Sequence, residues 1–283
     1  MNYSHAFHAG NFADTFKHAT LARILVHLRE KEPAFRVIDT HAGTGLYDLA
    51  SEEAARTGEW RDGIGRLLEA RLAPEIQELI APYLAAVAAH NEGGDLRRYP
   101  GSPLIALSLL RPQDRLVACE LEPRAARALA ANLRPDARAR AVAIDGWVAL
   151  NAYVPPNERR GVVIIDPPYE DKNEYARLAA AVIAAHRKWA TGTYLLWYPL
   201  KDRTGPDLLA DALLHGGIGK ILRAELELPP AAEPARLAGS GLIVINPPWR
   251  LAGEITSLLA ALRSVLRPAP GGRAVVDWVA GET

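Results

Sequence analysis

Cysteine is nearly absent from the sequence, since Cys119 is the single example in 283 residues. One cysteine cannot form an internal disulfide, and it excludes a zinc or iron–sulfur site built from several cysteines. Long apolar segments are missing as well, because the longest, 178–185, is too short to span a bilayer. The first thirty residues contain several charged side chains and nothing that resembles a secretory signal. We therefore expect a cytoplasmic protein that contacts no membrane.

Net charge is also absent, because 33 basic residues balance 33 acidic ones. This balance argues against a protein that coats nucleic acid through bulk charge, although it leaves room for an enzyme with a local basic patch. The arginine clusters at 97–98, 134–140 and 159–160 are expected to be solvated surface. Hydrophobic residues make up 49% of the chain and charged residues 23%, which is ordinary for a globular protein.

Helical and strand patterns alternate along the chain, which predicts the α/β class with a mainly parallel sheet covered on both faces. Strands are expected at 35–40, 115–120, 139–144, 161–166, 193–198, 221–228, 241–246 and 273–279. Helices are expected at 11–31, 124–133, 175–189, 206–214 and 254–266.

The residues between the first two strands, about 48–112, are too many for a normal crossover connection. They show helical patterns at 67–72 and 75–90 but no convincing strand. We interpret them as a helical insertion within a single domain, 1–283, which is long enough to bury most of its unfolded surface.

The segment 161–169 is the most informative part of the sequence. Its β-branched run predicts a strand buried on both faces, and the two prolines after Asp166 end that strand in a stiff conformation. An acid at the carboxyl end of a buried parallel strand lies where open α/β sheets bind ligands. The tetrapeptide 166–169, Asp-Pro-Pro-Tyr, resembles the active-site motif of methyltransferases that act on exocyclic amino groups or amides.

Acidic residues also end the three predicted strands before Asp166. The first strand leads into a glycine loop, 39–45, which begins with Asp39 and lets a ligand approach the backbone closely. Glu120 ends the second strand, where an acid can bond two ribose hydroxyls. The third ends at 145–146, where a carboxylate can accept from an adenine amino group. Any one of these acids could instead cap a helix, but four caps in succession are not expected.

The glycine loop also separates two classes of cofactor. Asp48 stands where the dinucleotide fingerprint needs a glycine, which argues against a nicotinamide dehydrogenase. An acid followed by Gly43 and Gly45 fits the loop of S-adenosylmethionine enzymes better. Taken alone, such a loop could also be an ordinary turn between a strand and a helix.

A second segment, 245–249, competes with the first, because its Asn-Pro-Pro-Trp sequence is also an amino-methyltransferase pattern. Position favours Asp166, which follows the glycine loop and the two other acids on the very next strand. Asn246 comes three strands later, where sheets of this kind add edge strands that are often antiparallel. We expect its prolines to end that strand and Trp249 to pack at the edge of the sheet.

Five blocks of sequence together resemble the RlmJ-type family, bacterial methyltransferases that modify the N6 of one adenine in 23S ribosomal RNA. The blocks are 3–14, 39–43, 99–105, 166–170 and 245–249, so the resemblance spans nearly the whole chain. It implies a class I, Rossmann-like methyltransferase fold with the helical insertion after the first strand and an N-terminal helical extension. It also implies S-adenosyl-L-methionine as cofactor, no metal, and 23S ribosomal RNA as partner, either protein-free or in an early assembly intermediate.

The resemblance assigns roles to individual residues. It implies that Asp166 is catalytic together with Pro167 and Tyr169. Tyr3 and His5 would lie near the target adenine. The residues implied around the cofactor are Lys17 or His18, Asp39, His41, Gly43, Ser102, Glu120, Asp145, Gly146 and Asp166.

Several of these residues have plainer interpretations from the sequence alone. His18 lies on a helix rich in apolar residues, where a histidine is usually packed. His41 could simply start a helix, and Ser102 precedes a proline as a helix N-cap would. The histidines and aromatic residues of 3–18 could also form an ordered N-terminus without a role in binding.

Methyl transfer to adenine needs few groups, because the main task is to align the nitrogen, the methyl group and the sulfur. Asp166 would accept a hydrogen bond from the amino group, and a backbone carbonyl beside Pro167 would accept a second. Tyr169 would stack on a base that has left its helical stack. Alternatives are an amino-group methyltransferase acting on DNA adenine, a protein amide or a small molecule, and a non-catalytic RNA-binding module.

Overall fold

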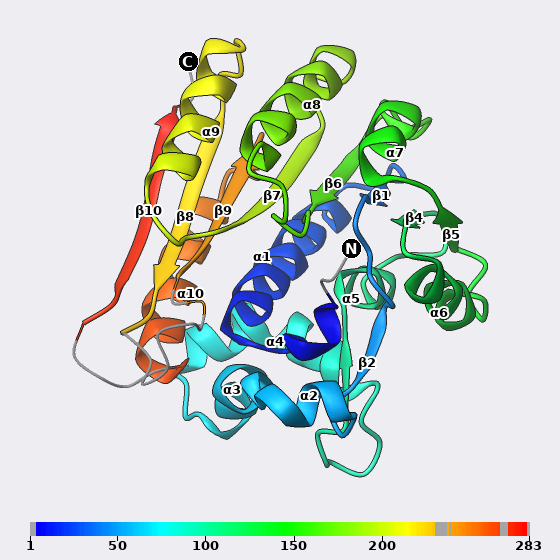
Figure 1. The fold of residues 1–283 in the computed structure, drawn as a ribbon, viewed down its shortest axis with the longest axis vertical. Coiled ribbons are helices and arrows are strands. Elements are labelled where there is room, and N and C mark those ends of the chain that lie inside the picture. Colours follow the sequence, from blue (N-terminus) through cyan, green and yellow to red (C-terminus); the bar gives the residue numbers. More distant parts are fainter. Residues whose placement is uncertain (1–3, 230–236, 238, 267–270, 282–283) are drawn as a thin grey trace.

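The computed structural model of the protein describes residues 4–229, 237, 239–266 and 271–281. An eight-stranded sheet forms its middle layer, in the order β10-β8-β9-β7-β6-β1-β4-β5, and helices cover both faces (Figure 1). The strands are β1 (Arg36–Asp39), β4 (Arg115–Glu120), β5 (Ala139–Ala143), β6 (Gly161–Ile165), β7 (Thr193–Pro199), β8 (Ile221–Glu227), β9 (Gly239–Ile245) and β10 (Arg273–Ala280). The predicted α/β class is confirmed.

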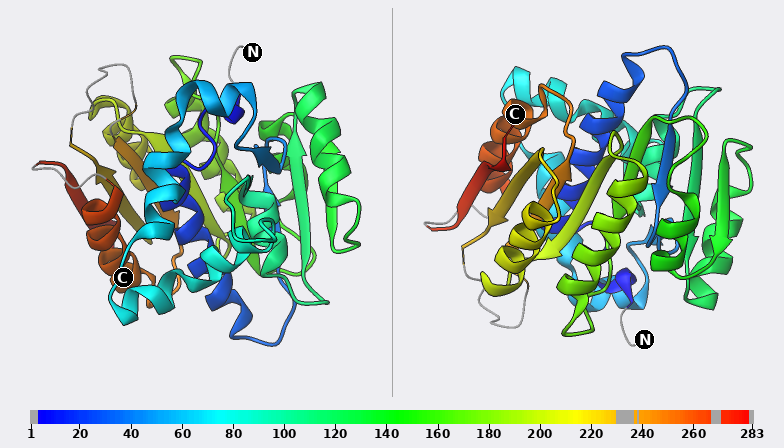
Figure 2. Two further views of the ribbon diagram at one scale, coloured as in Figure 1. Left: turned by 90° about the horizontal axis from the view of Figure 1, so that it is seen from below. Right: turned by 90° about the horizontal axis from the view of Figure 1, so that it is seen from above.

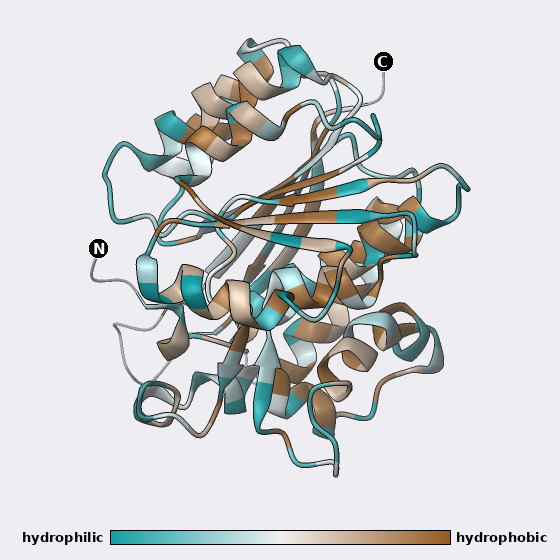
Figure 3. Cartoon of the chain, turned by 90° about the vertical axis from the view of Figure 1, so that its right-hand side faces the viewer, coloured by the Kyte–Doolittle hydropathy of each residue, from teal (hydrophilic) through white to brown (hydrophobic). Residues whose placement is uncertain are grey.

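Five neighbouring strands, from β5 to β7, run parallel, whereas β9 runs antiparallel between β7 and β8. β10 pairs antiparallel with β8 at the edge of the sheet. β6, in the centre of the sheet, is buried along its whole length because helices pack on each side of it, and hydrophobic residues colour much of the central strands brown in Figure 3. The expected edge position of the strand before Asn246 is wrong, since β9 has a neighbour on either side.

The helices form two layers, one on each face of the sheet, as the two views of Figure 2 show. Each layer packs on the sheet through its own apolar core. One layer contains α1 (Phe12–Arg29), α5 (Ser102–Ser108), α6 (Pro123–Leu133) and α10 (Leu251–Leu266). The other contains α7 (Gly146–Tyr153), α8 (Glu174–Lys188) and α9 (Thr204–His215). The structure adds α7, which the sequence patterns did not predict.

α1 is buried on almost every side, because the insertion covers the face that the sheet does not. Asn11 caps the N-terminus of this helix, because its side chain accepts a hydrogen bond from the backbone of Asp14 at 3.0 Å. Polar residues on this helix are therefore placed inside the protein, where each needs a partner.

The insertion contains two short strands in addition to helices. Its elements are β2 (Leu46–Asp48), α2 (Glu52–Thr57), the π-helical turn η2 (Arg61–Gly65), α3 (Arg66–Glu69), α4 (Pro74–Ala88) and β3 (Arg98–Pro100). β2 and β3 pair with each other and not with the main sheet, and three residues are too few to show an alternating pattern, so the expectation of no strand is wrong. α4 packs on α1 and α10, and on this ground we propose that the chain is a single domain.

The N-terminal extension, with the 3₁₀ turn η1 (His5–Phe7), is docked on the insertion. The backbone of Ile64 donates to the carbonyl of Gly10 at 2.9 Å. Gly63 makes this approach possible, because a Cβ at that position would lie 2.1 Å from the Gly10 oxygen. Among the residues that the structure describes, no helix has the length and apolar character needed to cross a membrane.

Candidate active site

A cavity of about 850 Å³ opens at the carboxyl ends of β1, β4, β5 and β6, which lie side by side in the sheet. Ligands of open α/β sheets bind at this edge. Most of the residues singled out in the sequence contribute to its wall, namely His5, Lys17, His18, His41, Gly43, Ser102, Glu120, Asp145, Gly146, Asp166 and Pro167. Asp39 and Tyr169 lie outside the wall, and Tyr3 lies outside the described residues.

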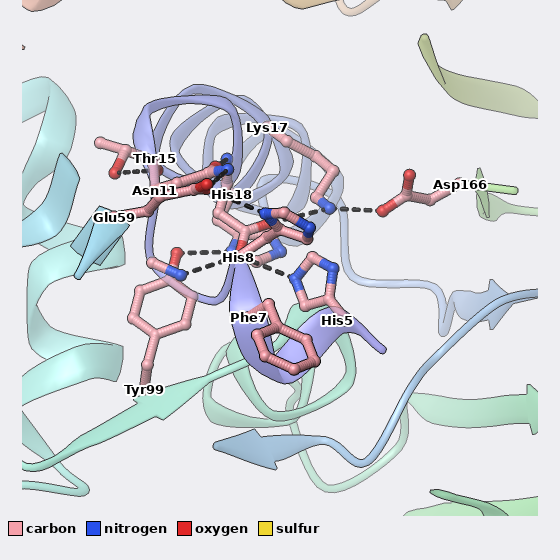
Figure 4. A network of polar contacts seen from close by, with 12 residues as sticks. His5, Phe7, His8, Asn11, Thr15, Lys17, His18, Glu59, Tyr99 and Asp166 are labelled. Atoms are coloured by element: carbon pink, nitrogen blue, oxygen red, sulfur yellow. Dashed lines mark hydrogen bonds and ion pairs between the residues drawn. The ribbon is translucent and has the colours of Figure 1, made fainter. Parts of the chain in front are cut away.

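Asp166 follows β6 and is held by a cation from α1. Its carboxylate forms an ion pair with the ammonium of Lys17 (Figure 4). The same ammonium also lies 3.0 Å from Asp14 Oδ1. Burial alone would lower the pKa of Lys17, but the charges of Asp14 and Asp166 outweigh it and raise that pKa above its ordinary value. Lys17 therefore carries a permanent positive charge against one oxygen of Asp166.

Asp14 is the site residue that the sequence analysis missed. His5 Nε2 lies 2.9 Å from its Oδ2, and the Gly10 backbone donates to the same oxygen at 2.9 Å. Burial would raise the pKa of Asp14, but His5 and Lys17 together hold it well below the usual range. The available signal was the spacing of Asp14 and Lys17, which places an acid and a base three residues apart on one helix face.

His18 lines the cavity and is also part of a buried hydrogen-bond chain. Its Nδ1 lies 2.7 Å from the hydroxyl of Tyr99, which lies 3.0 Å from the hydroxyl of Tyr83. Burial lowers the pKa of His18 to about 3, so its imidazole is neutral at physiological pH. The interpretation as a packed histidine and the position at the cavity are therefore both accurate descriptions of this residue.

The glycine loop is fixed to the end of β4 by Glu120. The Gly43 backbone donates to Glu120 Oε2 at 2.9 Å, and the Glu122 backbone donates to Oε1 at 2.8 Å. Gly43 has a φ of +60°, and a Cβ there would lie 2.1 Å from the hydroxyl of Tyr47. Both features require glycine. Glu120 thus shapes the loop while its carboxylate lines the cavity.

His41 is oriented by its neighbours. The Thr40 hydroxyl donates to the carbonyl of Ile164 at 2.9 Å, so it can only accept from His41 Nδ1, which lies 2.8 Å away. Burial lowers the pKa of His41 to about 4, and the neutral ring therefore keeps Nε2 as an acceptor. Gly146 lies against this ring, because a Cβ there would be 2.6 Å from Nε2.

Asp39 is fully buried next to the cavity wall. Its Oδ1 lies 3.4 Å from the His41 backbone nitrogen, while its Oδ2 has no hydrogen-bond partner among the described residues. Burial raises the pKa of Asp39 to about 7, and the nearby Ser102 hydroxyl works against that rise. A buried oxygen without a donor is costly to the folded protein.

Asp145 caps α7. Its Oδ1 accepts from the backbones of Trp147 at 2.9 Å and Val148 at 3.0 Å. The alternative interpretation of the strand-end acids as caps therefore applies to this residue. The cap uses one oxygen only, and the other lies 3.9 Å from the guanidinium of Arg177 at the cavity.

Ser102 occupies the first turn of α5 and not its N-cap, which is Gly101. The expectation of a serine cap is wrong, because the Ser102 side chain makes no capping hydrogen bond and instead lines the cavity beside Asp39.

Tyr169 packs beside the cavity without lining it. Its hydroxyl donates to the carbonyl of Trp197 at 2.8 Å, and its ring contacts those of Tyr175 and Trp197. Stacking of this ring on a target base therefore stays a prediction, and it requires the tyrosine to leave the Trp197 carbonyl. Pro167, in contrast, is part of the cavity wall.

Asn246 lies at the opposite edge of the sheet from Asp166, because β9 runs antiparallel to the central strands. Its amide donates to the carbonyls of Ala190 and Gly192, each at 2.8 Å, and joins two loops. The expectation that Trp249 packs at the edge is wrong, since its side chain is 80% exposed.

Potential metal ligands do not gather anywhere in the described part of the chain, where no three His, Cys, Asp or Glu side chains could hold an ion together.

Comparison with known proteins agrees with this arrangement. A family model described as "Ribosomal RNA large subunit methyltransferase D, RlmJ" matches residues 32–280. Proteins named "Ribosomal RNA large subunit methyltransferase J" from Escherichia coli and Haemophilus influenzae are 43% and 41% identical to the chain, each over the full length of both sequences.

Solved structures give the same result at the level of the fold. A protein from Legionella pneumophila superposes with a TM-score of 0.87 and 34% identity, over 96% of this chain and 98% of its own. A probable spermidine synthase from Corynebacterium glutamicum, at 14% identity, shares the fold with a TM-score of 0.50 over 93% of this chain and 74% of its own. The chain therefore belongs to the RlmJ family of ribosomal RNA large subunit methyltransferases.

Proposed function

We propose that the protein transfers a methyl group from S-adenosyl-L-methionine to the N6 amino group of one adenine in 23S ribosomal RNA. Membership of the family supports the methyltransferase activity on ribosomal RNA. The observation that carries the choice of an amino group is the Asp166 carboxylate, which follows a buried strand, faces the cavity and has one oxygen fixed by Lys17. No feature of the cavity favours DNA or a protein amide instead.

The residues present fit this cofactor. One oxygen of Asp39 has no hydrogen-bond partner among the described residues, and Glu120 lies where an acid can accept from ribose hydroxyls. Gly43 and Gly146 line the cavity with backbone alone, which lets a ligand approach closely. S-adenosyl-L-methionine supplies an electrophilic methyl group on a sulfonium. Together with Lys17 or His18, His41, Ser102, Asp145 and Asp166, these residues are proposed to hold it.

Asp166 would act on the adenine by accepting a hydrogen bond from N6. Lys17 occupies Oδ2, so Oδ1 is the atom that remains for the base. This hydrogen bond, with a second one to a backbone carbonyl beside Pro167, favours a tetrahedral nitrogen with a localised lone pair. When the N–C bond forms, N6 loses one proton, and Oδ1 is placed to accept it.

The N-terminal extension is proposed to contact the target nucleotide. His5 lines the cavity and contacts Asp14, whereas Tyr3 lies outside the described residues and its role follows from the resemblance alone. The target base must leave any helical stack to enter the cavity, which is easier in protein-free RNA or an early assembly intermediate than in a finished ribosome. We expect such a substrate in the cytoplasm.

The test is transfer of a radiolabelled methyl group to RNA from cells that lack the enzyme, followed by nucleoside analysis. We expect label in N6-methyladenosine. Asp166→Asn should abolish transfer, whereas Asn246→Ala should lose stability by about 1–2 kcal/mol and keep the parental rate while folded. Label in another nucleoside, or transfer that requires Asn246 and not Asp166, would contradict the proposal.

A further inference from the structure

Charge is distributed unevenly over the protein. The cavity wall contains eight Asp and Glu residues and three Lys and Arg residues. The insertion, residues 48–100, is acidic too, with ten Asp and Glu residues and six Arg residues. RNA carries one negative charge per phosphate, so neither surface attracts its backbone.

The compensating positive charge lies at the opposite ends of the strands, where the parallel strands begin and β9 ends. We call this side of the sheet the basal edge. Seven connections form it, namely residues 27–36, 108–115, 133–139, 153–161, 186–193, 214–221 and 246–254. They contain thirteen Arg and Lys residues and six Asp and Glu residues. Because the whole chain has no net charge, this edge carries a surplus that the rest of the molecule balances.

The register of the sheet brings these cations side by side. In the register of the sheet, Arg36 lies opposite Arg115 on β4 and opposite Gly161 on β6. Gly161 directly follows Arg160 in the sequence. Arginines therefore lie at the first residue of β1 and β4 and directly before the first residue of β6, on three adjacent strands. The last turn of α8 adds the basic pair 187–188 at the start of the next strand.

Several of these cations bond to backbone carbonyls and not to carboxylates. Arg160 donates to the carbonyl of Leu28 at 3.0 Å, and Arg115 donates to that of Pro112 at 2.8 Å. A carbonyl fixes a guanidinium without cancelling its charge. Burial and the neighbouring charge of Arg111 lower the pKa of Arg160, as expected where like charges gather.

An exposed aromatic ring lies on the same edge. The side chain of Trp249 is 80% exposed, and the guanidinium of Arg250 lies 5.3 Å from its ring centroid. Arg250 is in turn ion-paired with Glu30 across the edge. An exposed indole beside a held arginine offers a flat surface on which a base can stack.

We propose that the basal edge is a second RNA-binding surface, which holds phosphates and one unpaired base of the substrate at a distance from the target adenine. This inference rests on the proposed RNA methyltransferase function. Arg29, at the basal edge, follows Lys17, at the cavity, by 12 residues along α1, which corresponds to about 18 Å along the helix axis. Only an RNA that extends roughly this far beyond the target nucleotide can reach the edge.

The experiment compares two variants that remove the same charge. The basal variant combines K31Q, R159Q and R187Q, and the control combines R56Q, R71Q and R97Q from the insertion; all six side chains are exposed. Steady-state methylation is measured on two transcribed 23S fragments. One contains only the target loop, and the other also contains the flanking helices.

The basal variant should raise KM for the long fragment several-fold and leave kcat unchanged. The slope of log KM against log salt concentration should fall by about 2, since three cations leave the interface. The KM of the basal variant for the short fragment should match that of the parent. The KM of the control variant should match the parent for both fragments. Trp249→Ala should raise KM for the long fragment roughly tenfold without changing the melting temperature.

Equal KM values for the basal variant and the parent on the long fragment would overturn the inference. A loss in the control as large as that in the basal variant would also overturn it, because it places the contact on the insertion. A parent that methylates neither fragment would contradict the proposed function and not this inference alone.

Discussion

Replacing Asp39 by asparagine should stabilise the folded protein at high pH while weakening cofactor binding. Burial raises the pKa of Asp39 from an ordinary 3.8 to about 7. Between these two values the folded protein holds a proton that the unfolded chain has lost, so the stability contributed at Asp39 falls as pH rises and is constant above about 7. Three pKa units correspond to about 4 kcal/mol of penalty at high pH.

Asparagine cannot ionise, so the variant lacks this pH dependence. Relative to the parent, the free energy of unfolding of Asp39→Asn should increase by about 2 kcal/mol between pH of about 5.5 and about 8. Urea denaturation at both pH values measures it, with the exposed Asp95→Asn as the control for losing one acidic residue. Calorimetry at the higher pH should show weaker binding of S-adenosyl-L-methionine to Asp39→Asn, because the ligand loses an ionic acceptor.

The difference between variant and parent is the decisive quantity, since it cancels the titration of every other group. A difference that is the same at both pH values would refute the reasoning, because it would mean that the Asp39 carboxyl does not change its ionisation between them. Unchanged cofactor affinity in the variant would show that the unpartnered oxygen of Asp39 does not face the ligand.

Three further substitutions test the site. Gly146→Ala places a Cβ 2.4 Å from a backbone oxygen and should lower both cofactor affinity and melting temperature, whereas Gly253→Ala meets open space in α10 and should gain up to about 1 kcal/mol in unfolding free energy. Glu120→Ala should weaken cofactor binding in calorimetry by about 1.5–3 kcal/mol, and unchanged affinity would reject the ribose assignment. His5→Ala frees Asp14 from one partner and should slow single-turnover methylation more than it weakens cofactor binding; an equal loss in both would indicate a purely structural role.

The sequence alone determined the elements of the sheet and the acids at their ends. The segment 115–120 was predicted to the residue, and the other strands agree within one or two residues at each end. β-branched runs, helix periodicity and prolines act on immediate neighbours, so a local pattern is enough to place them. The order of the glycine loop, Glu120, Asp145 and Asp166 then predicted one cavity, because the ends of adjacent parallel strands meet.

Only the tertiary structure decided which polar atoms meet. Lys17 and Asp166 are separated by 149 positions, and they pair because α1 is enclosed between the sheet and the insertion. The same enclosure gives His18 its tyrosine partner. Partners of this kind depend on how whole elements pack, and no periodicity along the chain encodes them.

The exposed ring of Trp249 is a second feature that the sequence pattern did not predict. Its sequence, next to two prolines at the end of an apolar strand, favours packing, yet the structure leaves the ring in solvent. The register of β1, β4 and β6 likewise gathers cations that are far apart in a chain without net charge. Composition reports only the sum of the charges, whereas the fold decides where each sign collects.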